Sequence, residues 1–169
     1  VRGIMQRGLR YLNAPVRALE VLREVTVTDG AARATLSPAK TLTIEFEIDF
    51  VDAAIGHQHK ALIMENGSFA RELCDSRTFC RQADVDQMRA AGLALGGSAG
   101  ENAVVFDGAN VLSPGGLRHA DEPVRHKMLD ALGDLSLAGA PLIGRYTGVR
   151  AGHSLTNTLL RKLFSTPGA

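Results

Sequence analysis

One predicted helix carries a histidine and two aspartates at regular spacing. His126, Asp130 and Asp134 lie four residues apart, and Lys127 stands between the first two. At 100° per residue the three positions spread over about 80° of the helix circumference, so they share one side. A histidine and an aspartate one turn apart can bind a divalent cation together. A solvent-exposed polar face explains the same spacing, because two ligands do not complete a metal site.

The C-terminal segment is basic. Residues 135–169 contain no Asp or Glu. Their basic side chains are those of Arg145, Arg150, Arg161 and Lys162. Such a region beside an acidic helix favours an anionic ligand such as a phosphate, although scattered solvated charges give the same composition. His153 precedes a predicted helix in an Ala-Gly-His-Ser turn, where a histidine is more often a surface or capping residue than a catalyst.

Hydrophobic patterning predicts the elements that would position these side chains. Helices are expected over residues 2–12, 68–76, 84–91, 121–137 and 154–164, β-structure over 16–28, and further strands over 41–50, 103–106 and 143–149. The core side of the long helix is expected to hold Val124, Met128, Ala131, Leu132 and Leu135. Asp29-Gly30 predicts a hairpin turn, Asp121 an N-cap, and His57-Gln58-His59 a surface loop. Helices and strands mix without strict βαβ alternation, which predicts an α+β fold: a two-layer sandwich of a mixed sheet and helices.

Composition excludes several classes of protein. The 169 residues have 22% charged side chains and a net charge of +1, which argues against disorder and against a general nucleic-acid binder. Two cysteines, Cys74 and Cys80, are too few for a disulfide framework and are expected as buried or incidental thiols. No apolar run is long enough for a membrane span, and no signal peptide is recognised at the start. A soluble cytoplasmic domain is therefore expected.

Several motifs together resemble one enzyme family. They are Asn-Ala-Pro at 13–15, Ser-Arg-Thr-Phe at 76–79, Leu-Gly-Gly-Ser with Glu-Asn-Ala-Val-Val within 95–105, the run Asp-Glu-Pro-Val-Arg-His-Lys-Met-Leu-Asp-Ala-Leu-Gly-Asp at 121–134, and Gly-His-Ser-Leu-Thr-Asn at 152–157. Their order and content resemble the zinc-dependent UDP-3-O-acyl-N-acetylglucosamine deacetylases of lipid A biosynthesis. The resemblance covers nearly the whole chain.

The resemblance implies roles for individual residues. His126 and Asp130 would bind Zn²⁺. His153 would stabilise the developing oxyanion and protonate the leaving amine, Asp134 would hold His153, and Thr78 would help stabilise the tetrahedral intermediate. The residues expected to contact the nucleotide-sugar acyl substrate are Lys127, Arg150, Phe79, Asp84, Gly97 and Ser98. A small βαβ insert, at about 79–105, would line the passage for the acyl chain.

The resemblance also implies a missing part. Residues 1–13 resemble the last helix of a first domain, and residues 14–169 resemble the second catalytic domain. In the family a Glu-His pair of the first domain supplies the third zinc ligand and the general base, and this sequence has no Glu-His step. The missing N-terminal domain is expected in cis or in trans, and the isolated chain is expected to be inactive. The alternatives are a non-catalytic module that binds nucleotide-sugars or other anions, and one half of a split enzyme.

Two local departures from the family accompany this resemblance. The loop 96–102 is one residue longer than usual, which leaves its contacts open. Cys80 and Arg81 stand where the family usually has a glycine and an apolar aromatic residue, which changes the expected entrance of the acyl passage.

Overall fold

The computed structural model describes residues 1–10, 12–65, 67–92 and 103–168. Its main element is a five-stranded sheet in the order β2-β3-β10-β4-β5, formed by Val25–Asp29, Ala32–Ser37, Arg145–Val149, Thr43–Asp49 and His57–Ile63. Strand β10 runs parallel to β4 and antiparallel to β3, and the other neighbours are antiparallel. The sheet is therefore mixed.

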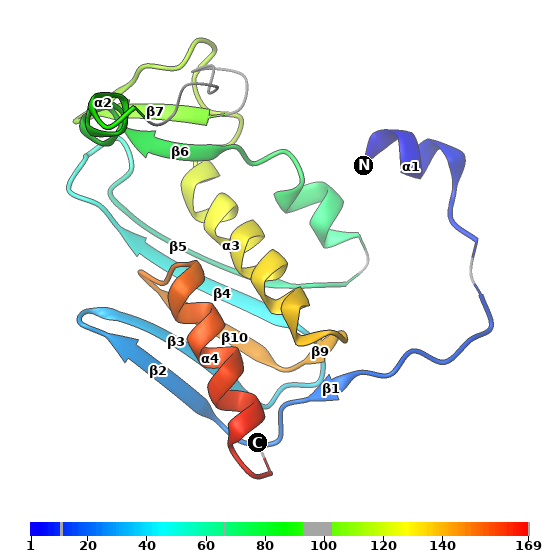
Figure 1. The fold of residues 1–169 in the computed structure, drawn as a ribbon. Helices are drawn as coiled ribbons and strands as arrows, with labels where there is room; N and C mark the ends of the chain where they lie inside the picture. The colour runs from blue at the N-terminus through cyan, green and yellow to red at the C-terminus, as the bar shows by residue number, and fades with distance from the viewer. Residues whose placement is uncertain (11, 66, 93–102, 169) are drawn as a thin grey trace.

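Two helices cover one face of this sheet (Figure 1). Helix α3 (Glu122–Leu135) contacts β4 and β5, and α4 (His153–Ser165) contacts β2 and β3. The alternation in β4 is the one that the sequence predicts, because Ile44, Phe46 and Ile48 are buried under the helices. Gly148 of β10 lies against the ring of Phe46, where a Cβ atom would be only 2.7 Å from the ring. The predicted α+β sandwich is confirmed.

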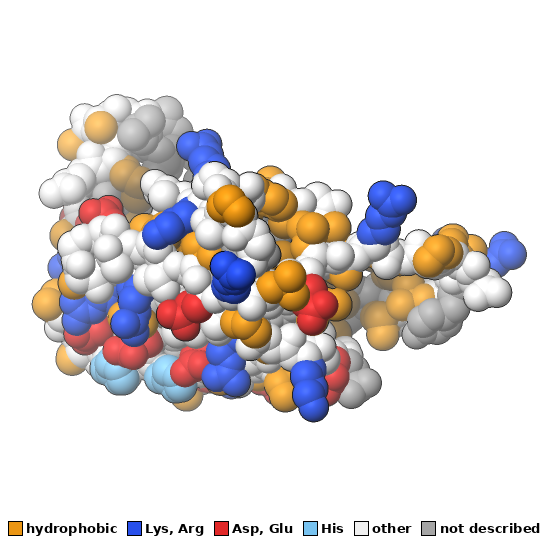
Figure 2. All heavy atoms as spheres, turned by 90° about the horizontal axis from the view of Figure 1, so that it is seen from below, with side chains coloured by type: hydrophobic (Ala, Val, Ile, Leu, Met, Phe, Trp, Pro, Cys, Tyr) orange, Lys and Arg blue, Asp and Glu red, His pale blue; other side chains and the backbone are white. Residues whose placement is uncertain are grey.

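The face of the sheet away from the helices is charged. Glu45 and Glu47 of β4 accept hydrogen bonds from His59 and His57 of β5, at 3.0 and 3.2 Å, and Arg145 of β10 pairs with Glu45. Figure 2 shows histidine, acidic and basic side chains together along the lower border of its view. The expected surface loop at His57–His59 is wrong, because these residues pair with β4 as part of a strand.

A smaller sheet carries the βαβ insert. Strands β6 (Thr78–Arg81) and β7 (Ala103–Asp107) are parallel, with α2 (Gln82–Ala90) between them, and β8 (Asn110–Val111) completes the sheet. The segment before β6 is a short π-helix, η1 (Phe69–Leu73), rather than the α-helix expected over 68–76. Its neighbour α3 ends in a 3₁₀ turn, η2 (Ser136–Ala138).

The N-terminal arm leaves the body of the molecule. Helix α1 (Arg2–Arg7) and the following residues expose Ile4, Met5, Leu9 and Leu12, and they project to one side in Figures 1 and 2. The arm joins the body at β1 (Leu19–Glu20), which pairs in parallel with β9 (Leu142–Ile143). Among the described residues, none of the helices has the length and apolar content to cross a membrane.

Candidate metal and catalytic site

Helix α3 brings the two proposed metal ligands together. His126 and Asp130 are one turn apart, and Nε2 of His126 lies 3.2 Å from Oδ1 of Asp130. The other oxygen, Oδ2, accepts a hydrogen bond from Nζ of Lys127 at 3.1 Å. These polar side chains face away from Val124 and Met128, which are fully buried in the core. These polar residues therefore share the side of α3 away from the core, as their spacing predicts.

The His126 ring is fixed from two directions. Its Nδ1 lies 3.4 Å from the backbone carbonyl oxygen of Ser76, and its ring is nearly perpendicular to that of Phe79, with the two centroids 6.2 Å apart. Burial lowers the pKa of His126, and this effect outweighs the nearby charge of Asp130, which acts in the opposite direction. A neutral imidazole keeps a lone pair for a metal ion, so the residue suits a ligand role.

A second histidine–aspartate pair lies next to the first. His153, the first residue of α4, has Nδ1 at 3.0 and 2.9 Å from the two carboxylate oxygens of Asp134. Its Nε2 lies 3.9 Å from Oδ2 of Asp130. The Asp134 side chain is largely buried, whereas that of His153 is 63% exposed. The carboxylate thus anchors a ring whose other nitrogen remains open to a ligand.

A pocket of about 330 Å³ joins most of the predicted residues. Its lining includes Thr78, Phe79, Asp84, His126, Lys127, Asp130 and Arg150. It also includes Cys80 and Arg81, whose types depart from the family pattern. Gly97 and Ser98 lie outside the described residues. The insert thus supplies one wall of the pocket and α3 another.

Arg150 sits at the rim in an unusual backbone conformation. Its φ of +50° is the left-handed conformation that non-glycine residues rarely adopt. Its guanidinium forms an ion pair with Asp49 at the end of β4, and its backbone N–H donates to the carbonyl oxygen of Glu47 at 2.8 Å. Both contacts hold the cationic side chain beside the pocket.

The donor set suits zinc but is not complete within the described residues. His126 and Asp130 offer the nitrogen and oxygen donors that zinc binds, and the burial of His126 favours its neutral form. Across the described ranges, no three His, Cys, Asp or Glu side chains lie close enough to form a metal-binding group. Helix α3 therefore offers two possible metal donors, and the described residues place no third one beside them.

Sequence reasoning missed a buried ion pair beneath the site. Glu122 of α3 is 1% exposed and binds Arg77, the residue before β6. Burial on its own would raise the pKa of Glu122, but hydrogen bonds from Arg77 and from two backbone N–H groups lower it to about 2. The only trace of this pair in the sequence was Glu122 itself, which follows Asp121 in the motif at 121–134. Asp121, and not Glu122, was expected to have a structural role, as the N-cap of the helix. Asp121 makes no capping hydrogen bond and instead pairs with Lys60 and Arg125.

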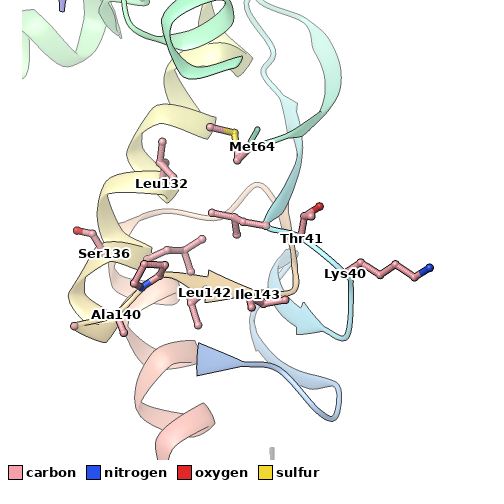
Figure 3. Close-up of a pocket in the computed structure, with 12 residues that line it drawn as sticks. Lys40, Thr41, Met64, Leu132, Ser136, Ala140, Leu142 and Ile143 are labelled. Carbon is pink, nitrogen blue, oxygen red and sulfur yellow. The ribbon is translucent and has the colours of Figure 1, made fainter. Parts of the chain in front are cut away.

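A larger apolar pocket lies at the other end of α3. Its volume is about 690 Å³, and Figure 3 shows Leu132, Met64 and Leu142 approaching it from α3, the end of β5 and β9. It is separate from the histidines and aspartates of the candidate site. Nothing in the sequence distinguished its residues from ordinary core positions.

The sequence of the chain matches those of known proteins. The profile of the UDP-3-O-acyl N-acetylglycosamine deacetylase family matches residues 1–165. The chain belongs to this deacetylase family. A UDP-3-O-acyl-N-acetylglucosamine deacetylase of Phenylobacterium zucineum is 50% identical over 169 residues, which are 100% of this chain and 57% of the relative. Family members of the same name from an Anaeromyxobacter species and from Pseudomonas entomophila are 42% and 45% identical over 98% of this chain and 54% and 55% of their own lengths. The chain thus spans little more than half the length of these deacetylases.

Proposed function

We propose that this chain forms the C-terminal catalytic part of a zinc-dependent deacetylase of lipid A biosynthesis. The reaction is hydrolysis of the N-acetyl group of UDP-3-O-acyl-N-acetylglucosamine, which releases acetate. The observation that carries the proposal is the adjacency of two His–Asp pairs, of which the first, His126 and Asp130, lines the pocket. His126 and Asp130 have the donor types of a zinc site, and His153 is held by Asp134 beside them.

His126 and Asp130 would hold the metal in this proposal. Zinc, when bound, would polarise the amide carbonyl and lower the pKa of a bound water molecule, and both effects favour amide hydrolysis at neutral pH. The second oxygen of the Asp130 carboxylate accepts a hydrogen bond from Lys127. Because both residues belong to α3, this helix itself sets the orientation of Asp130.

His153 and Thr78 act on the substrate itself. Asp134 fixes the ring of His153, whose Nε2 lies 3.9 Å from Oδ2 of Asp130, a residue that lines the pocket. A protonated His153 stabilises negative charge on the carbonyl oxygen and then donates its proton to the amine nitrogen as the C–N bond breaks. The hydroxyl of Thr78 lies at the same pocket and donates to the developing oxyanion. Water supplies the oxygen of the released acetate.

The cationic and aromatic groups would bind the rest of the substrate. Lys127 and Arg150 line the pocket and attract the diphosphate, whose charge each can neutralise. Phe79 packs edge to face against Phe50 and Phe106, which makes that wall apolar and suits an acyl chain. Asp84 lines the same wall, and the proposal keeps Gly97 and Ser98 as further contacts in the insert.

The missing ligand and the base are assigned to another part of the protein. Residues 1–13 would close a preceding domain, and residues 14–169 would be the second domain. Relatives of nearly twice the length support this division. The third zinc ligand and the general base would come from that N-terminal domain, joined in cis or supplied in trans, and the chain alone would bind zinc weakly and be inactive.

The test compares the chain with a completed protein. The part of the Phenylobacterium zucineum relative that lies outside the alignment is fused ahead of residues 1–169 or added separately. Acetate release and bound zinc are measured with His126→Ala and with His59→Ala, a control on the opposite face of the sheet. We expect activity only in the completed protein and loss of zinc only in His126→Ala. Deacetylation by the chain alone would contradict the division. Binding of UDP without any metal dependence or turnover would indicate an anion-binding module instead.

A further inference from the structure

A buried bidentate ion pair between Arg77 and Glu122, here called the fork, joins the start of β6 to the start of α3. The Arg77 guanidinium donates from Nε to Oε1 of Glu122 and from Nη2 to Oε2, both at 2.9 Å. The backbone N–H of Arg77 donates to Oε1 at 3.0 Å, and that of Arg118 donates to Oε2 at 2.7 Å. Nη2 also donates to the carbonyl oxygen of Gly116 at 2.7 Å. Each oxygen of Glu122 thus has two donors, so the carboxylate has one orientation.

The residues on either side of Arg77 belong to the candidate site. The carbonyl oxygen of Ser76 faces Nδ1 of His126 at 3.4 Å, and Thr78 lines the pocket. On α3, Glu122 lies one turn before His126. The fork therefore connects the segment before β6 to the first turn of α3. Ser76 and Thr78 flank Arg77 in the first of these, and His126 follows Glu122 by one turn in the second.

We propose that the Arg77–Glu122 fork is a positioning device for His126. By fixing the peptide of Arg77 to α3, it holds the Ser76 carbonyl against Nδ1 and aims Nε2 toward Asp130. Carbonyl groups that accept a hydrogen bond from the outer nitrogen of a ligand histidine set its orientation and raise metal affinity. The inference rests on the proposed function, since it assigns the reason for orienting His126 to zinc binding.

A second ion-pair cluster provides a matched comparison. Arg125 of α3 binds Asp121 and Glu72, at 2.6 and 2.7 Å, and Lys60 reaches Asp121 at 3.0 Å. This cluster ties the same end of α3 to η1 and β5 but makes no contact with the segment 76–78 in these bonds. A purely structural role for Arg77 would make the two arginines equivalent. If Arg77 has a positioning role, the orientation of the His126 ring depends on Arg77 and not on Arg125.

The experiment introduces the same change at both arginines of the full 169-residue chain. Arg77→Lys keeps the charge but cannot form the fork, and Arg125→Lys is the control. Zinc affinity is measured by competition with a coloured chelator, and the ring nitrogens of His126 are observed by NMR without metal. We expect Arg77→Lys to weaken zinc binding about 10-fold or more and to shift the His126 resonances, with little change in Arg125→Lys. If Arg77→Lys unfolds, Glu122→Asp replaces it, because it retains the charge and shortens the reach.

The outcomes separate the fork from the function. Equal zinc affinity and unchanged His126 resonances in Arg77→Lys would overturn the positioning role. Equal losses in both lysine variants would also overturn it, because they would reflect the anchoring of α3 in general. If the unaltered chain binds no measurable zinc, the two donors of α3 do not suffice without the third ligand, and the His126 resonances alone decide whether the fork orients the ring.

Discussion

Nδ1 of His153 lies within hydrogen-bond distance of both carboxylate oxygens of Asp134, at 3.0 and 2.9 Å. The two residues come from different helices, α4 and α3, so the packing of these helices sets the position of the ring. Asp134 is also one turn beyond Asp130. The proposed acid and the proposed metal ligand are therefore tied to the same helix.

Replacing Asp134 by asparagine tests this arrangement. The amide keeps the shape of the side chain but carries no charge to stabilise a protonated His153. We expect Asp134→Asn in the completed protein to lower kcat by about 10²- to 10⁴-fold, the usual contribution of a positioned acid–base group. Bound zinc is expected to remain, which elemental analysis checks. Full turnover in this variant would rule out the proposed role of the pair.

The buried carboxylate of Glu122 makes stability depend on pH. Its pKa falls from 4.5 in the unfolded chain to about 2 in the folded one, so the folded state favours the ionised form. The resulting stability is fully present above about pH 4.5 and is lost as the pH falls toward 2. The difference corresponds to about 3 kcal/mol. Urea unfolding between pH 6 and 2.5 measures it, and the Glu122→Gln variant should lack this part of the pH dependence. An unchanged pH profile in that variant would contradict the assignment.

Gly148 should not tolerate a side chain. A Cβ at this position would lie 2.7 Å from the ring of Phe46, which is itself buried. We expect Gly148→Ala to destabilise the fold by about 1–3 kcal/mol, the usual effect of overpacking. Gly133 in α3 is the control, because nothing lies within 4 Å of its Cβ position. Gly133→Ala is expected to stabilise the helix by up to about 1 kcal/mol. Chemical denaturation of both variants gives the comparison.

Ser76 contains a buried hydroxyl without a hydrogen-bond partner among the described residues. Because its removal leaves no partner unsatisfied, Ser76→Ala is expected to be neutral or to stabilise the fold by about 1 kcal/mol. Ser113 is the matched control, since its hydroxyl bonds the N–H of Val105 at 2.9 Å and the carbonyl of Ala103 at 3.2 Å. Ser113→Ala should cost about 1–3 kcal/mol. A similar loss in Ser76→Ala would mean that its hydroxyl is bonded in solution.

The sequence predicted the features that depend on nearby residues. The alternation around Phe46 and the fourfold spacing from His126 each have a local period, so the buried face of β4 and the polar side of α3 followed from them. Long-range partners were not predictable in this way. Asp121 was expected as a cap, but its carboxylate pairs with Lys60, which is 61 residues away. Glu122 became important only through Arg77, at a separation of 45 residues.

The strand β5, which begins at His57, shows the same limit. Its residues pair with Asp49 and Glu47 across the sheet, and two isolated histidines around a glutamine give no periodic signal of their own. Only the neighbouring strand decides that this segment is extended. The polar pairs on that face were therefore found only in three dimensions.

Helix α3 presents an acidic or imidazole side chain at each successive turn: Glu122, His126, Asp130 and Asp134. In the same order, these contact Arg77, the Ser76 carbonyl, Lys127 and His153. One inserted or deleted residue between Glu122 and Asp134 would rotate everything beyond it by 100° and break several of these contacts at once. Substitutions in this helix can be tested one contact at a time, but its length cannot change. Variation in chain length among relatives is therefore expected before Asp121 or after Leu135, and not between them.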